Sequence, residues 1–202
     1  MSKSQSVILR EKGNAVFCSA SQDGVGRSLK ASRLKDALNI YTQAKSCSCN
    51  DVERSSAAKN IGTAASKLVD LMIEREEREE DVKFYFCEAL ANFDEAFQLS
   101  GCKNEAWGDN LYAKFHELVQ DIISYYSENS TADFNERMSE LESFIPLISN
   151  AKHLRCELCI EIAQLRFNEG VSCLGRRDFK TCLRQIKECH RPVEVNKLGW
   201  VV

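Results

Sequence analysis

Residues 88–107 read "EALANFDEAFQLSGCKNEAW" and contain the pattern that decides the fold. Ala89, Phe93 and Ala96 lie four and three residues apart, so they share one face of an α-helix. Two small residues flank a large one on that face, which lets a neighbouring helix approach closely while the large ring fills the gap. The stretch therefore predicts a helix packed tightly against a second helix.

The same small, large, small pattern recurs in "LKDALNIYTQA" (34–44) and "DFKTCLRQIKEC" (178–189). Its members there are Ala37, Tyr41, Ala44 and Cys182, Ile186, Cys189. The helix before each of the three patterns has a glycine in its interior: Gly13 in "REKGNAVF", Gly62 in "AAKNIGTAAS" and Gly170 in "RFNEGVSCLG". A glycine inside a helix costs about 1 kcal/mol relative to alanine, so we interpret these three as sites of close helix contact.

Composition favours an all-α chain, because 44% of the 202 residues are apolar and only two are proline. Period and capping predict eight helices, over about 4–19, 31–46, 51–80, 82–99, 104–127, 133–149, 151–175 and 177–190. Their joints are short apart from an expected loop over 18–33, and short joints imply antiparallel pairs.

Local sequence also suggests where several of these helices begin. The expected N-caps are Asp51, Asn150 and either Thr131 or Asp133. The charged run 74–81 is expected to be a solvated helical extension or a turn between helices, with an acidic docking strip as the functional alternative.

Helix pairs of this kind resemble the tetratricopeptide repeat, a helix-turn-helix unit of about 34 residues. Residues 88–107 give the best match, with Trp107 at the aromatic position that opens the repeat signature. The match departs from the family pattern in the glycine spacings, 49 and 108 residues, and at Leu111, where glycine is expected. The resemblance implies a single domain, 1–202: a right-handed superhelix of about four antiparallel pairs with insertions. Its units are about 4–46, 51–99, 104–149 and 151–190.

In this family the first helices of successive units line a concave groove. Chaperone-binding members use cations and amides there to hold an acidic C-terminal tail. By resemblance, Arg10, Asn14 and Asn60 occupy such positions, whereas the alignment through Trp107 puts Glu105 and Asp109 where cations are expected. A co-chaperone-type receptor for an acidic tail is therefore one alternative.

The charge distribution supports a different ligand. Residues 51–150 carry 9 Lys and Arg against 21 Asp and Glu, while both flanking segments are mildly basic. A groove lined by Glu105, Asp109 and Glu117, with a positive end, would suit a basic or mixed-charge segment. The predicted peptide-binding groove comprises Arg10, Asn14, Lys59, Asn60, Lys67, Trp107 and Asp109.

Other chemistries have weaker support in the sequence. His153, Cys156 and Cys159, with the later Cys189 and His190, lack a second Cys-x2-Cys, so no metal site and no cofactor is expected. No phosphate loop, nucleophile elbow or zinc-protease motif occurs, so no enzymatic activity is expected. The basic residues Arg177, Lys180, Arg184, Lys187 and Arg191 leave nucleic-acid binding as a further alternative, against an acidic isoelectric point near 5.7.

The sequence has no run of 18 apolar residues, and its first 14 residues show no apolar segment followed by a small-residue cleavage site, so no secretory leader is expected. The ten cysteines are accordingly interpreted as reduced thiols. We expect a soluble cytoplasmic protein-interaction module that binds a protein or peptide partner and no membrane. The apolar ending "KLGWVV" suggests part of a longer adaptor.

Overall fold

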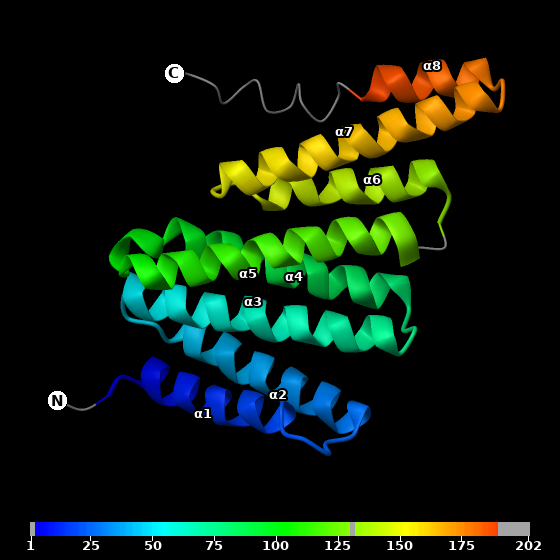
Figure 1. Ribbon diagram of the computed structural model, residues 1–202. Coiled ribbons are helices and arrows are strands. Elements are labelled where there is room, and N and C mark those ends of the chain that lie inside the picture. The colour runs from blue at the N-terminus through cyan, green and yellow to red at the C-terminus, as the bar shows by residue number, and fades with distance from the viewer. Residues whose placement is uncertain (1–2, 130–131, 190–202) are drawn as a thin grey trace. The chain divides into compact units, whose positions relative to one another are not determined.

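The computed structural model describes residues 3–129 and 132–189, and that part of the chain contains eight α-helices and no strand (Figure 1). The helices are α1 (Gln5–Ala20), α2 (Arg27–Ser46), α3 (Asp51–Glu74), α4 (Glu79–Gln98), α5 (Glu105–Ser124), α6 (Phe134–Phe144), α7 (Lys152–Gly175) and α8 (Phe179–Glu188). Short 3-10 turns, η1 (Ser100–Cys102) and η3 (Ile145–Leu147), and a π-helical turn, η2 (Tyr125–Asn129), connect some of them. The prediction of an all-helical chain is confirmed.

The bounds expected for the 18–33 loop and for the 51–80 helix were wrong, whereas the turn expected within residues 74–81 is present. The loop expected over 18–33 shrinks to residues 21–26, because α1 continues to Ala20 and α2 already begins at Arg27. The helix expected over 51–80 ends at Glu74, and α4 begins at Glu79. The charged run 74–81 is therefore a turn between helices, as one interpretation held.

Side chains cap the N-termini of α3 and α6, two of the helices for which the sequence predicted a cap. Asn50, not Asp51, caps α3, because its Oδ1 accepts a hydrogen bond of 2.9 Å from the backbone N–H of Glu53. Asp133 caps α6 in a reciprocal capping box, as expected for one of the two candidates. The other candidate, Thr131, lies outside the described residues.

The sixth and seventh helices are both shorter than expected at their shared joint. Residues 133–149 were expected to be helical, but α6 ends at Phe144, just before a 3-10 turn that contains Pro146. Asn150 does not cap α7, which begins after Ala151 without a side-chain cap. A proline turn therefore separates these two helices.

The chain divides into two compact units, residues 1–118 and 119–202, and the division falls inside α5. The sequence had predicted a single domain over 1–202. In the first unit, α1 and α2 form an antiparallel pair, α3 and α4 form another, and α3 also packs on α2 (Figure 1). In the second unit, α7 and α8 form a pair, and α6 contacts α7.

Close contact between a glycine and a large side chain holds each of these three pairs together. A Cβ added at Gly13 would lie 2.5 Å from the ring of Tyr41, and one added at Gly62 would lie 2.6 Å from the ring of Phe93. At Gly170 the nearest atom, on Ile186, would be 3.3 Å away. The inference that these three glycines mark close helix contacts is confirmed, and the first two contacts are the tightest.

We expect Gly62→Ala to destabilise the first unit by about 1–3 kcal/mol, because the ring of Phe93 must shift to admit a methyl group. Gly108→Ala is the matched control, since α5 leaves open space around that position. Its alanine should be neutral or stabilise the chain by up to about 1 kcal/mol through helix propensity. Urea unfolding followed by circular dichroism measures both changes, and equal effects would contradict the contact argument.

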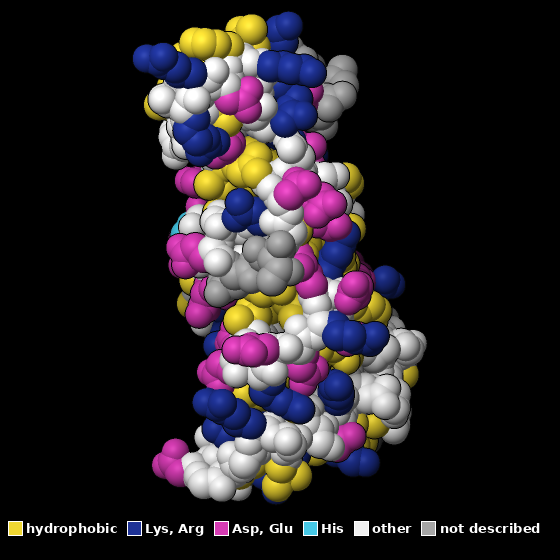
Figure 2. All heavy atoms as spheres, turned by 90° about the vertical axis from the view of Figure 1, so that its right-hand side faces the viewer, with side chains coloured by type: hydrophobic (Ala, Val, Ile, Leu, Met, Phe, Trp, Pro, Cys, Tyr) yellow, Lys and Arg dark blue, Asp and Glu magenta, His cyan; other side chains and the backbone are white. Residues whose placement is uncertain are grey.

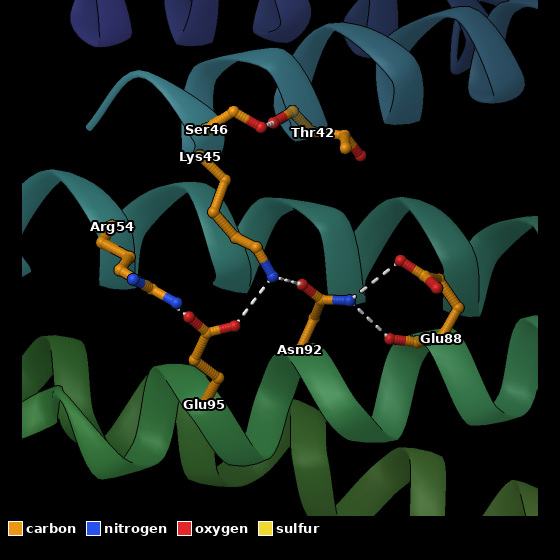
Figure 3. Close-up of polar contacts among 7 residues, drawn as sticks. All are labelled: Thr42, Lys45, Ser46, Arg54, Glu88, Asn92 and Glu95. Atoms are coloured by element: carbon orange, nitrogen blue, oxygen red, sulfur yellow. Dashed lines mark hydrogen bonds and ion pairs between the residues drawn. The ribbon is translucent and has the colours of Figure 1, made fainter.

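A polar network ties α2, α3 and α4 together (Figure 3). The Nζ of Lys45 donates to Oδ1 of Asn92 and to Oε2 of Glu95, both at 2.7 Å. Arg54 donates from Nε to Oε1 of the same Glu95 at 2.6 Å, and Asn92 donates to Glu88. Burial alone would raise the pKa of Glu95, but the hydrogen bonds and charges of Lys45 and Arg54 outweigh it and lower that pKa.

We expect Glu95→Gln to destabilise the chain at pH 7 by about 1–3 kcal/mol, because it removes the carboxylate partner of the half-buried Lys45. The pKa of Glu95 is lower in the folded than in the unfolded chain, so its contribution is complete above the unfolded value of 4.5 and is lost as pH falls through the folded value. The stability difference between wild type and Glu95→Gln should therefore narrow as pH falls from 6 to 3. Unfolding curves at several pH values test this, and a constant difference would contradict the assignment.

A candidate binding pocket between α1, α3 and α5

The first unit contains a pocket of about 310 Å³. Three helices that are not consecutive in the chain, α1, α3 and α5, supply most of its wall, and the ring of Tyr41 from α2 supplies the rest. The lining residues are Asn14, Phe17, Tyr41, Lys59, Asn60, Thr63, Asn110 and Lys114. A smaller hollow shares Thr63 and Lys114 with this pocket and is otherwise lined by Ser66, Lys67, Phe93 and Glu117.

An amide chain crosses one wall of the pocket. Oδ1 of Asn14 accepts hydrogen bonds from the hydroxyl of Tyr41 at 2.9 Å and from Nδ2 of Asn60 at 3.0 Å. With its oxygen doubly occupied, Asn14 has its Nδ2 group left to donate to a ligand. Burial, followed by the nearby Cys18 thiol, raises the pKa of Tyr41, so the phenol keeps its proton and remains a donor.

Two lysines, Lys59 of α3 and Lys114 of α5, also line the pocket. The ammonium group of Lys59 lies over the indole ring of Trp107, 4.9 Å from its centroid, and that of Lys103 lies 5.4 Å from it. Burial, and then the positive charges of Lys114 and Lys103, lower the pKa of Lys59. Among the residues that the structure describes, neither Lys59 nor Lys114 forms an ion pair with a carboxylate.

This arrangement suits an anion. Lysine ammonium groups and amide N–H groups are donors, and hydrogen bonds from a cation to a carboxylate are among the strongest that proteins form. A carboxylate between Lys59 and Lys114 would also relieve the repulsion between the two ammonium groups. The pocket therefore has the donors and the uncompensated positive charge that a carboxylate or phosphate requires.

The residues predicted from the sequence are only partly brought together. Asn14, Lys59 and Asn60 line the main pocket, and Lys67, paired with Asp70 at 3.0 Å, lines the smaller hollow. Trp107 lies beneath Lys59 without being among the lining residues. Arg10 and Asp109 line neither hollow.

Only one of the three α5 residues expected to line an acidic groove lies in either hollow. Glu105 and Asp109 are exposed and line neither hollow, and only Glu117 does so, in the smaller one. The α5 residues in the main pocket are Asn110 and Lys114. Each lies five positions after the groove residue that the alignment through Trp107 predicted, Glu105 or Asp109. Neither residue was expected in the groove, although the pair repeats the four-residue spacing between a cation and an amide seen at Arg10 and Asn14.

The basic residues near the C-terminus also differ from the expected single helical face. Arg177 lies in the turn before α8, with a positive φ of 61°. Arg191 lies outside the described residues. Within the described part, only Lys180, Arg184 and Lys187 of that set belong to α8.

Comparisons with protein-family models, with curated proteins and with solved structures found no match. Among the described residues, no group of three or more His, Cys, Asp or Glu side chains is placed to hold a metal ion. No helix in the same part of the chain has the length and apolarity needed to cross a membrane.

We expect Lys59→Met to stabilise the chain at pH 7 by on the order of 0.5 kcal/mol, because it removes a half-buried charge repelled by Lys114 and Lys103. The methionine can keep the contact with Trp107. Because the pKa of Lys59 is lower in the folded than in the unfolded chain, its charge costs stability below the folded value, and the cost disappears as pH rises past the unfolded value of 10.5. The gain should thus shrink between pH 7 and pH 10.

Thermal unfolding of wild type and Lys59→Met across that pH range measures the effect. The control is Lys35→Met, which changes an exposed lysine of α2 away from the pocket. A loss of stability in Lys59→Met alone would mean that the repulsion is not felt.

Proposed function

We propose that this chain is a protein-interaction module without catalytic activity, and that it binds an acidic segment of a partner peptide in the pocket between α1, α3 and α5. The observation that carries the proposal is the convergence of Lys59 and Lys114, with no carboxylate paired to either in the described residues, on a pocket whose other polar groups are mainly amides. The ligand group is a carboxylate, either an acidic side chain or a free C-terminus.

The pocket favours this ligand over the basic or mixed-charge segment that the acidic middle of the sequence suggested. Such a ligand would have to approach Lys59 and Lys114, and like charges at short range repel. Glu117 is the one acidic residue among the described lining residues, and it lies in the smaller hollow, with Lys67 and Lys114. A peptide with an acidic end could thus place its carboxylate in the main pocket and a polar or basic residue near Glu117.

The walls support an extended peptide, rather than a small metabolite, as the proposed ligand. Three helices line an open pocket in which Phe17 and the ring of Tyr41 supply apolar surface next to the donors. The amide chain fixes Asn14 and Asn60 before a ligand arrives, which reduces the entropy lost on binding. A peptide can place apolar and acidic side chains on these two kinds of surface.

The test is fluorescence anisotropy with a labelled seven-residue peptide that ends in two aspartates and a free carboxylate, at low salt. We expect Lys59→Ala combined with Lys114→Ala to weaken binding at least tenfold, since a hydrogen bond to a charged group contributes about 1.5–3 kcal/mol. Added salt and an amidated peptide terminus should weaken it as well. Lys35→Ala controls for the loss of an exposed lysine outside the pocket, and equal binding by this control and the double variant would reject the pocket.

A further inference from the structure

The α7–α8 pair has an apolar face exposed to solvent. On α8, Phe179 is 60% exposed, Leu183 61% and Ile186 40%. The exposed large apolar residues of α7 are Ile160, Phe167, Val171 and Leu174. Large apolar side chains gathered on one face are typical of surfaces that bind a partner.

Helical geometry places these side chains on one side of the pair. Arg166 on α7 donates to Glu142 of α6 and to Gln185 of α8, and Gln185 donates to Asn135 at the start of α6. That side of the pair therefore faces α6. An α-helix turns by about 100° per residue. By this rotation Arg166 lies to one side of Gly170, and the exposed Phe167, Val171 and Leu174 lie to the other. The three exposed α8 residues lie likewise on the other side from Gln185.

The first two pairs show what covers the same positions. Tyr41, Phe93 and Ile186 each face the glycine of their pair, so the residues seven and three positions earlier are equivalent. In α2 the equivalents of Phe179 and Ile186 are Leu34 and Tyr41, 4% and 2% exposed, and in α4 they are Phe86 and Phe93, 0% and 1% exposed. The side chains at these two positions are thus buried in the α1–α2 and α3–α4 pairs and exposed in the α7–α8 pair.

A helix provides the cover in both cases. The α2 equivalent of Leu183 is Leu38, which packs against a buried cluster that includes Ile61 and Ala64 of α3. In the next pair, Phe93 packs against Phe115 of α5, with ring centroids 5.8 Å apart. This face of a helix pair is therefore shaped to receive another helix, and no helix of the described residues in the second unit buries it.

A basic edge runs beside the apolar residues of α8. Lys180, Arg184 and Lys187 each follow an exposed apolar residue, so they form a parallel row about 100° around the helix. In the part of the chain that the structure describes, none of the three forms an ion pair with a carboxylate. Figure 2 shows Lys and Arg side chains gathered with apolar ones at the top of the view, where the α7–α8 turn faces the viewer.

We propose that this face binds an amphipathic α-helix of a partner protein, with an apolar stripe seated on Phe179, Leu183, Ile186 and the exposed residues of α7. The occupant is a helix because helices cover the equivalent faces of the first two pairs. It has acidic residues along one flank because the edge that it meets is basic. The face is separate from the pocket between α1, α3 and α5.

A synthetic peptide copying residues 105–124 is a suitable probe. This is the α5 sequence, which supplies a covering helix within the chain, and it carries Glu105, Asp109, Glu117 and Asp121 against one lysine. We expect the labelled peptide to bind the full chain in fluorescence anisotropy, with affinity falling as salt is added. A peptide with Glu117→Lys and Asp121→Lys should bind at least tenfold more weakly.

Matched variants locate the binding. Phe179→Ser with Leu183→Ser should weaken peptide binding at least tenfold, whereas Phe84→Ser should not change it, because Phe84 is an equally exposed phenylalanine, 60%, on α4. Arg184→Glu with Lys187→Glu should reduce both the affinity and its salt dependence. Lys59→Ala with Lys114→Ala should leave this binding intact, which separates it from the proposed acidic-peptide pocket. Circular dichroism confirms that each variant keeps its helix content.

Four results would overturn the proposal. The first is unchanged peptide affinity in the Phe179→Ser, Leu183→Ser variant. The second is a dimer in sedimentation that this variant dissociates, which would make a second copy the occupant. The third is a tenfold gain in peptide affinity on Trp200→Ser, which would assign the face to the chain's own C-terminal segment. The fourth is binding to phosphatidylserine vesicles that the same variant abolishes, which would make a lipid surface the target.

Discussion

The packing of an aromatic ring directly on a glycine is the contact on which the first unit depends. Tyr41 on Gly13 and Phe93 on Gly62 leave no room for a methyl group, so each pair of helices is held at one separation. The same two rings also line the hollows of this unit, Tyr41 the main pocket and Phe93 the smaller one. The hydroxyl of Tyr41 orients Asn14, and Phe93 lines the adjoining hollow while packing on Phe115. A change in helix separation would therefore also move the donors of the pocket.

The contacts that could be predicted from the sequence are those with a short-range signature. Each large side chain stands at fixed spacings from two small ones in an amphipathic pattern. Asn14, directly after Gly13, and Asn60, two residues before Gly62, were located by their resemblance to amide positions of the repeat family. In α5 the position equivalent to the contact glycine holds Leu111, so the alignment depended on Trp107 alone. That alignment pointed to the carboxylates of Glu105 and Asp109, which are exposed. Asn110 and Lys114 reach the pocket through the rotation of α5 on α3, and packing between helices decides that rotation.

The sign of charge in the pocket is opposite to the net charge of the segment that builds most of it. Residues 51–150 are strongly acidic, but Glu95 is neutralised by Lys45 and Arg54, and Asp70 pairs with Lys67. Lys59 and Lys114 remain without such partners in the described structure, and Trp107 supports the Lys59 ammonium group through its ring face. A charge count along the sequence does not report which charges are paired, so it does not give the sign of the charge in this pocket.

The glycine contact fixes how the two helices of a pair meet, and the neighbouring residues then decide what the pair can bind. The position after the glycine is Asn14 in α1 and Thr63 in α3, and both line the polar pocket. In α7 the same position is Val171, one of the exposed apolar residues. Four positions after Gly170 lies Leu174, whereas Ser66 stands at the equivalent place in α3. One packing device can thus support a polar pocket in one unit and an exposed apolar face in the other, because it constrains only the side of each helix that meets its partner.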